Sequence, residues 1–349
     1  MEEQILKIGM PAGSLADPKR GGSLIRLLEY AGFKTSGYES GGPSKFSTIN
    51  YLFGWDGRPQ EFGSQLGINE LDVAIAGDDW IYERKLEMQF EYKKNIELEK
   101  ILSLKRGYVN IVGIINSDDE HNTIEDFLKI LCRDKKIITI VSEMPYIALN
   151  WLLEKLKNIG EYKNFNKFSV QKYKTPHKIN HGIIVYETWG KTEAKVKNLG
   201  ADIGVEITQT GDAIRNYGLK IIDTVMKSET GIWISPGLKK DVNKADLLKM
   251  FVLNLYGVVN AENKVMILFN VANNNVKQIE QYLRDNNLFA DEPTVNPGKA
   301  FTEFSIQVDI KNPDIPLAKI RYELAQRKAV NINTIPVDSS IQNIDILDF

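Results

Sequence analysis

Residues 205–222, which read VEITQTGDAIRNYGLKII, combine the residue types that bind a phosphorylated sugar. An apolar strand ends near Glu206, a short polar turn follows, and a helix is expected to begin at about Asp212. Glycine lets the backbone approach a ligand closely, and the first amides of a helix lack partners within it, so this turn predicts a phosphate site. The strand-end carboxylate is placed to accept hydrogen bonds from ribose hydroxyls. The expected binding residues are Glu206, Thr208, Gln209, Thr210, Gly211, Asp212, Ala213 and Ile214.

A second turn of the same kind precedes it, with GKTE (190–193) between a strand and a helix. Thr210 or Asp212 alone is typical of an ordinary helix cap. Two such turns, each with its own carboxylate, favour the interpretation as a binding site. Asp212 places a negative charge near the expected phosphate, which lowers affinity unless its side chain caps the helix or faces a bound magnesium ion.

The composition indicates a globular α/β protein of two or three domains. The 349 residues include 44 basic and 46 acidic side chains, so the basic surface that nucleic acids require is absent. No apolar run is long enough to span a bilayer, and the acidic N-terminal residues are unlike a secretory signal, so we expect a cytoplasmic protein. Cys132 lies in an apolar helical pattern and is expected to be a small buried residue rather than a nucleophile. The three histidines lack metal-ligand spacing and are expected at the surface: His121, His177 and His181.

Short apolar runs alternate with amphipathic helical patterns through most of the chain. The runs are rich in valine and isoleucine, and their alternation with helices favours parallel sheets that bind ligands at the carboxyl ends of strands. A long helix is predicted over 239–262, and the segments after it predict a ferredoxin-like βαββαβ module with an additional strand near 293–296. The predicted strands before the long helix are 5–11, 72–77, 108–115, 136–142, 182–188, 202–207 and 231–236.

Taken in order, these motifs resemble the signature of the ATP phosphoribosyltransferase family, the enzymes that begin histidine biosynthesis. The family pattern G-S-V-E, A-D-x-I-V-D and T-G-T-T-L-R-x-N-G-L is matched by GKTE (190–193), ADIGVE (201–206) and TGDAIRNYGL (210–219). Residues 58–83 are similar, without a gap, to its R-x-R-D-I-P…L-D-L-G-I-T-G-x-D-W-V-x-E segment, and SEMP (142–145) resembles its T-E-Y-P turn. The similarity spans nearly the whole chain and is to the long form of the family.

The sequence departs from the family pattern at several polar positions. The start, MPAGSL, resembles the family's P-K-G-R-L, but it has Ala12 and Ser14 in place of lysine and arginine. An arginine in the strand after the first hinge corresponds to Asn110, and two threonines of the phosphate turn correspond to Asp212 and Ala213. The nearby cations that would substitute are Lys19, Arg20, Arg58, and Lys105 with Arg106 beside the hinge.

The resemblance implies two lobes like those of periplasmic binding proteins and a C-terminal ferredoxin-like, ACT-like regulatory domain. The first lobe would comprise 1–107 with 220–243, the second 108–219 with the phosphoribosyl-binding loop, and the regulatory domain 244–349. In the family, the C-terminal domain binds histidine as an inhibitor and helps to assemble a homohexamer.

The resemblance also implies the chemistry. A ring nitrogen of ATP would attack the anomeric carbon of phosphoribosyl pyrophosphate, and pyrophosphate would leave, with Mg²⁺ as cofactor. Glu193 and Glu206 would be the catalytic carboxylates, which hold ribose hydroxyls or a magnesium-bound water and favour the cationic sugar. The residues expected to contact the nucleotide or pyrophosphate are Ser14, Lys19, Arg20, Arg58, Asp78 and Asp79.

Three alternatives stay open at this point. Asp78 and Asp79 follow a predicted strand, where helix capping is an equal alternative to substrate contact. Ala12, Ser14 and Asn110 leave room for a paralogue that uses an acceptor other than ATP. The same residues also fit a non-catalytic protein that binds a small anion or regulates an enzyme.

Overall fold

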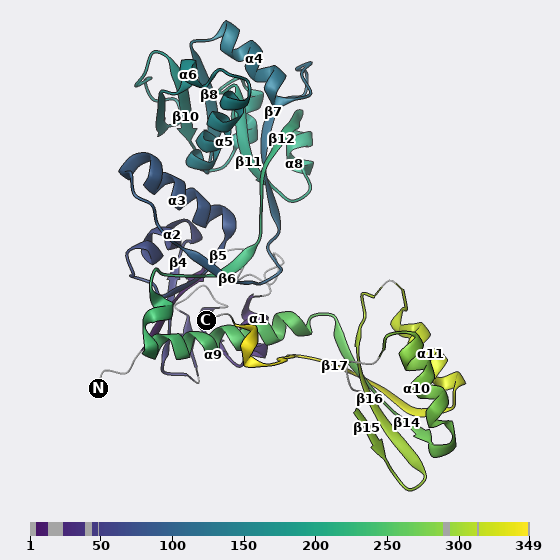
Figure 1. Ribbon diagram of the computed structural model, residues 1–349. Helices are drawn as coiled ribbons and strands as arrows, with labels where there is room; N and C mark the ends of the chain where they lie inside the picture. The colour runs from purple at the N-terminus through teal and green to yellow at the C-terminus, as the bar shows by residue number, and fades with distance from the viewer. Residues whose placement is uncertain are drawn as a thin grey trace. The chain divides into compact units, whose positions relative to one another are not determined.

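The computed structural model describes residues 5–12, 24–38, 44–47, 49–288, 294–312 and 314–347, which form two compact units (Figure 1). The larger unit consists mainly of Phe33–Val252, and the smaller unit mainly of Leu253–Asp348. Within the described ranges, no helix is long and apolar enough to cross a membrane.

The first half of the larger unit is built on a five-stranded sheet. Its elements are β1 (Leu6–Pro11), β2 (Thr35–Ser36), β3 (Lys45–Phe46), β4 (Leu52–Gly57), α2 (Pro59–Gly67), β5 (Val73–Gly77), α3 (Asp78–Tyr92), β6 (Glu99–Ser103) and β13 (Thr230–Ile234), and α1 (Leu24–Tyr30) lies between β1 and β2 in the chain. The strand order is β4-β1-β5-β13-β6, in which β4, β1 and β5 are parallel and β13 is antiparallel to both neighbours. Phe62 and Leu66 of α2 share a buried core with Ala74 of β5 and Ile81 of α3.

The second half of the larger unit is a six-stranded sheet in the order β12-β7-β11-β8-β10-β9. Its elements are β7 (Val109–Asn116), α4 (Ile124–Asp134), β8 (Ile137–Ser142), α5 (Pro145–Asn158), α6 (Tyr162–Phe165), β9 (Phe168–Lys172), β10 (Gly182–Glu187), α7 (Thr192–Lys197), β11 (Ile203–Thr208), α8 (Asp212–Asn216) and β12 (Leu219–Ser228). β8 is parallel to both β10 and β11, so the carboxyl ends of these three strands lie at one edge of the sheet. The buried helix α5 contributes Ile147, Trp151 and Leu152 to the core beneath them.

The structure confirms the predicted strands before the long helix but corrects the expectation of parallel sheets. Both sheets are mixed, because β7, β12 and β13 run antiparallel to their neighbours where the chain passes between the two halves. The strands β4, β6, β9 and β12 were not predicted; all four lie at sheet edges and carry charged residues. β12 pairs with β7 along its length, so residues 220–228 belong to the second sheet rather than to the first lobe.

The smaller unit has the predicted ferredoxin-like topology. After the short turn η3 (Leu238–Lys240), the long helix α9 (Val242–Ala261) leads into β14 (Lys264–Ala272), η4 (Asn273–Asn275), α10 (Val276–Asp285), β15 (Thr294–Pro297), β16 (Phe301–Asp309), α11 (Leu317–Gln326), β17 (Ala329–Pro336) and η5 (Ile344–Ile346). The antiparallel strand order β15-β16-β14-β17 is that of a four-stranded βαββαβ module, and β15 is the strand expected near 293–296. Phe269 and Phe304 stack at 5.3 Å between ring centres in its core.

Candidate functional site

The turns that follow β8, β10 and β11 meet at one edge of the second sheet. Glu143 lies in the turn after β8, and its carboxylate accepts a hydrogen bond from the backbone N–H of Gly190 in the turn after β10. Gly190 has φ of +70°, a left-handed conformation that other residues adopt only at a cost. The sheet order β11-β8-β10 therefore joins two turns that are separated by more than forty residues in sequence.

Glu206, near the end of β11, is a half-buried carboxylate at this edge. One of its oxygens accepts a hydrogen bond from the backbone N–H of Ile207 at 2.9 Å. Burial raises the pKa of Glu206 to about 7, and the carboxylates of Glu193 and Glu143 act in the same direction. Three carboxylates thus influence one another here, as expected for a site that stabilises positive charge.

Lys195 on α7 completes this group. Its ammonium donates to the carbonyl oxygen of Gly190 at 2.6 Å, and burial lowers its pKa, while Glu143, Glu206 and Glu193 act in the opposite direction. Lys195 had no assigned role in the sequence analysis, and Glu143 was noticed only as part of a motif. Glu143 directly follows a predicted strand, and a polar residue at that place was the available sign of a binding residue. Lys195 lies one helical turn after Lys191 of the GKTE turn, and this spacing was the available sign that it faces the same site.

The predicted phosphate turn connects β11 to α8, which begins at Asp212 as expected. The Thr208 hydroxyl accepts from the N–H of Gly211 at 2.8 Å, and Gly211 has φ of +77°. The Thr210 hydroxyl donates to Asp212 at 2.5 Å. Gln209 and Ala213 are exposed, whereas the Ile214 side chain is 1% exposed, so Ile214 can present only its backbone to a ligand.

The charge of Asp212 is compensated within the turn. The Arg215 guanidinium donates to the Asp212 carboxylate at 2.5 Å and to the Thr210 carbonyl at 3.1 Å. The hydrogen bonds from Thr210 and Arg215 lower the pKa of Asp212. The Arg215 guanidinium therefore holds the Asp212 carboxylate against the helix, and its positive charge offsets most of the repulsion that Asp212 would exert on a phosphate.

One further position of the family pattern, Asn110, lies beside this turn. Asn110 on β7 stands directly opposite Thr208 on β11, and opposite Lys227 of β12 on its other side. Directly opposite residues of antiparallel strands share a face of the sheet. The family has an arginine at the position of Asn110. Here Lys227, directly opposite on β12, is the nearest cation on that neighbouring strand.

The carboxylates at this edge fit magnesium only together with a substrate. In the part of the chain that the structure describes, no three acidic, histidine or cysteine side chains are arranged to hold a metal ion by themselves. Mg²⁺ is commonly held by one or two carboxylates and by substrate phosphates. Glu193 and Glu206 are suited to a site of this kind, in which two carboxylates share the ion with a substrate phosphate.

The first-lobe residues that were expected to contact the nucleotide lie in different surroundings. Arg58 directly precedes α2 and is exposed. Asp78 forms an ion pair with Lys100 at 2.9 Å, and Asp79, 5% exposed, accepts from the N–H of Trp80 at 2.9 Å. Both aspartates thus have contacts within the protein. Ser14, Lys19 and Arg20 lie outside the described residues.

The family model for ATP phosphoribosyltransferase, HisG, matches residues 58–256, which is more than half of the chain and includes every turn of this site. The chain belongs to the ATP phosphoribosyltransferase family. It is therefore a phosphoribosyltransferase, an enzyme of the glycosyltransferase type, and the family resemblance inferred from the sequence motifs is confirmed.

Individual relatives agree with this assignment. The ATP phosphoribosyltransferase of Chlorobium chlorochromatii is 28% identical over 271 residues, which cover 77% of this chain and 76% of that protein. The ATP phosphoribosyltransferase of Archaeoglobus fulgidus is 28% identical over 244 residues, which cover 69% of this chain and 75% of that protein. A solved HisG:HisZ complex from Thermotoga maritima superposes with a TM-score of 0.49 at 14% identity, over 72% of this chain and 98% of that one, which is too remote to add to the assignment.

Proposed function

We propose that this chain joins ATP to phosphoribosyl pyrophosphate with release of pyrophosphate, the first step of histidine biosynthesis, and that the donor binds at the edge formed by β8, β10 and β11. Family membership supports the reaction. The observation that supports the place is the meeting of three strand-end turns, which bring Glu143, Glu193 and Glu206 to the same edge as the phosphate turn.

The transferred ribose gains positive charge as pyrophosphate leaves, so the enzyme has mainly to position the substrates and stabilise charge. Glu206 and Glu193 are placed to accept hydrogen bonds from the ribose hydroxyls. In its ionised form, Glu206 also lowers the energy of the cationic sugar. Because its pKa is raised to about 7, a substantial part of this carboxylate is protonated in the free enzyme at neutral pH.

The turn from Thr208 to Ile214 is the proposed site of the 5-phosphate. The amides at the start of α8 have no acceptor within the helix. Gly211 itself has no side chain, the Arg215 guanidinium lies beside it, and Thr210 is exposed next to it. Arg215 offsets Asp212, so the turn presents little net charge of its own.

Magnesium and the acceptor complete the proposal. Glu193 and Glu206 would hold Mg²⁺ together with the pyrophosphate group, and the metal would neutralise charge on the leaving group. On the first lobe, Arg58 is proposed to contact ATP or pyrophosphate, with Ser14, Lys19, Arg20, Asp78 and Asp79 as the other expected contacts.

The test is a pyrophosphate-release assay with phosphoribosyl pyrophosphate and a panel of nucleotides and bases. We expect release with ATP and no release without it. Release with a different acceptor would support the paralogue that Ala12 and Asn110 leave open. No release with any acceptor, from protein that binds phosphoribosyl pyrophosphate, would support the non-catalytic alternative.

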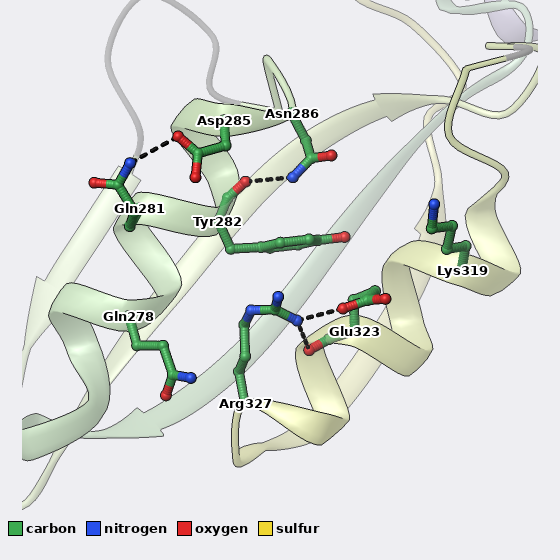
Figure 2. A pocket seen from close by; sticks show the side chains of 8 residues that line it. All are labelled: Gln278, Gln281, Tyr282, Asp285, Asn286, Lys319, Glu323 and Arg327. Atoms are coloured by element: carbon green, nitrogen blue, oxygen red, sulfur yellow. Dashed lines mark hydrogen bonds and ion pairs between the residues drawn. The ribbon is translucent and has the colours of Figure 1, made fainter.

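We also propose that the smaller unit binds an effector, which is histidine in the family. A hollow of about 470 Å³ lies between α10 and α11 (Figure 2). Figure 2 shows Asp285 and Lys319 at opposite sides of this hollow, so it offers both a carboxylate and an ammonium group, as a zwitterionic amino acid requires. It is lined by Gln278, Gln281, Tyr282, Asp285, Asn286, Lys319, Glu323 and Arg327.

This effector proposal has its own test. Lys319→Gln should weaken inhibition by histidine without changing the uninhibited rate, whereas Lys311→Gln, an exposed control in the same unit, should leave inhibition unchanged. Equal inhibition of both variants would mean that the effector binds elsewhere. Light scattering with and without histidine would show whether the expected assembly of several copies forms.

A further inference from the structure

Glu83 on α3 is a buried carboxylate whose two oxygens are bound by a helix of the other lobe. It is 4% exposed, and its oxygens accept hydrogen bonds from the backbone N–H groups of Tyr146 at 3.0 Å and Ile147 at 2.8 Å. These amides belong to the first turn of α5, where they have no acceptor within the helix. A carboxylate is buried at such cost that it needs partners of this kind, and a helix N-terminus favours its charge.

More contacts surround this pair of hydrogen bonds. The Tyr146 hydroxyl donates to the carboxylate of Glu91 at 3.1 Å, and Leu86 of α3 belongs to the buried core of the second lobe. α3 begins directly after β5 of the first sheet, whereas α5 begins directly after the turn that follows β8 of the second. Helix α3 therefore extends from the first lobe, the expected acceptor side, and fixes the start of α5 in the second lobe, the proposed donor side.

The start of α5 in turn fixes Glu143. The turn between β8 and α5 is short: the N–H of Met144 donates to the Ser142 hydroxyl at 2.9 Å, and that hydroxyl donates to the Val205 carbonyl at 2.9 Å. Glu143, between them, holds the N–H of Gly190. Because only Met144 and Pro145 separate Glu143 from the amides that Glu83 binds, a shift of the first turn of α5 moves the Glu143 carboxylate.

We propose that Glu83 is a positioning residue of the transfer reaction, which holds the first turn of α5 and thereby keeps Glu143 against Gly190 at the phosphoribosyl site. The role rests on the proposed function, because it assigns the donor to that edge. Glu83 touches neither substrate and is not a catalytic residue. Its effect on the reaction passes through the Ser142–Met144 turn.

The surroundings of Glu83 are consistent with this role. Burial raises its pKa to about 8, while the amides of Tyr146 and Ile147 and the charge of Arg84 act in the opposite direction, and Glu87 adds to the rise. The hydrogen bonds to α5 are the favourable contacts that oppose the burial of the carboxylate. Removing them leaves an unsatisfied amide in a buried place, which costs more than a lost surface contact.

The experiment compares Glu83→Gln with the matched control Glu87→Gln, one turn along the same helix, where the carboxylate pairs with Arg84 at the half-exposed surface. A glutamine can accept from only one of the two amides. We expect the KM for phosphoribosyl pyrophosphate to rise by about tenfold in Glu83→Gln with the KM for ATP nearly unchanged. Hydrogen exchange at the amides of Tyr146 and Ile147 should become about tenfold faster or more. Glu87→Gln should change neither quantity.

Faster exchange with an unchanged KM for phosphoribosyl pyrophosphate would overturn the proposal and leave Glu83 with a structural role alone. Equal rises in both KM values would also overturn it. If Glu83→Gln does not fold, Glu83→Asp, which keeps a carboxylate on a shorter side chain, takes its place: the KM for phosphoribosyl pyrophosphate should rise with the KM for ATP nearly unchanged, and a folded Glu83→Asp with an unchanged donor KM and faster exchange at Tyr146 and Ile147 overturns the proposal. A wild-type enzyme that releases no pyrophosphate contradicts the proposed function instead, and then the effect of Glu83→Gln on phosphoribosyl pyrophosphate binding and on exchange decides the positioning role.

Discussion

Asn110 on β7 and Thr208 on β11 face each other directly in the antiparallel register, at the end of β11 from which the phosphate turn departs. Position 110 is therefore close to the proposed phosphate turn. Because Asn110 stands where the family has an arginine, this chain has one positive charge fewer at that place. Lys227 stands opposite Asn110 on the neighbouring strand and keeps one cation at this end of the sheet.

We expect Asn110→Arg to lower the KM for phosphoribosyl pyrophosphate several-fold at low ionic strength. An added cation on the Thr208 face attracts phosphate, and salt screens that attraction within about 10 Å at 0.1 M. The measurement is the KM for each substrate at low and high salt. Asn198→Arg, an exposed change after α7, serves as the control for net charge, and identical behaviour of the two variants would show that position 110 does not reach the substrate.

Glu206→Gln should reduce kcat by roughly 10²–10³, the range observed when a single group that stabilises charge is removed from an active site. The substitution keeps the shape of the side chain, so the melting temperature at neutral pH should change little. Single-turnover assays would measure the loss. Glu187→Gln at the end of β10, where the carboxylate pairs with Lys172, is the control, and it should retain activity.

The pH dependence of stability gives an independent check on Glu206. The pKa of this carboxyl in the folded protein, about 7, is above its ordinary value of 4.5, so the folded state holds the proton more tightly than the unfolded state does. The resulting stabilisation is complete below pH 4.5 and is lost as the pH rises through 7, by roughly 3 kcal/mol. Chemical denaturation of the wild type and Glu206→Gln from pH 5 to 8 should show a steeper decline in the wild type. Parallel curves would contradict the raised pKa.

Asp212→Thr should strengthen binding of phosphoribosyl pyrophosphate at low salt. It removes the carboxylate that pairs with Arg215 and leaves that guanidinium beside the phosphate turn. Isothermal titration at two salt concentrations would measure the gain, which should shrink at high salt. Asp134→Asn breaks a comparable exposed pair with Arg133 far along the chain and should not alter donor affinity. Weaker binding by Asp212→Thr would indicate that Asp212 faces the metal or the ribose instead.

The parts of the site that were predictable from sequence are those made within a single strand-turn-helix segment. The phosphate turn with Gly211 and the start of α8 at Asp212 are of this kind, because strand, glycine and helix signals follow one another along the chain. The contact between Glu143 and Gly190 could not be predicted, since it depends on β8 lying between β10 and β11. The antiparallel pairing of β7 and β13, whose positions in the chain were predicted, was missed for the same reason.

The ion pair between Asp212 and Arg215 could likewise not be predicted from the sequence. Asp212 and Arg215 are three residues apart, a spacing that permits a pair but does not require one. The ferredoxin-like module was predicted well, because its alternating strands and amphipathic helices are local signals. Its hollow between α10 and α11 arises from side chains on two separate helices and had no sequence signal.

The hold of Glu83 on α5 also limits how the two lobes can be exchanged between relatives. A second lobe transplanted by itself would begin α5 with two buried amides and no carboxylate to receive them. A chimaera that fuses the second lobe of this enzyme to a foreign first lobe would have to keep α3, although α3 follows β5 in the chain. The boundary at which such recombinants remain active should therefore cut through the first lobe rather than run between the two sheets.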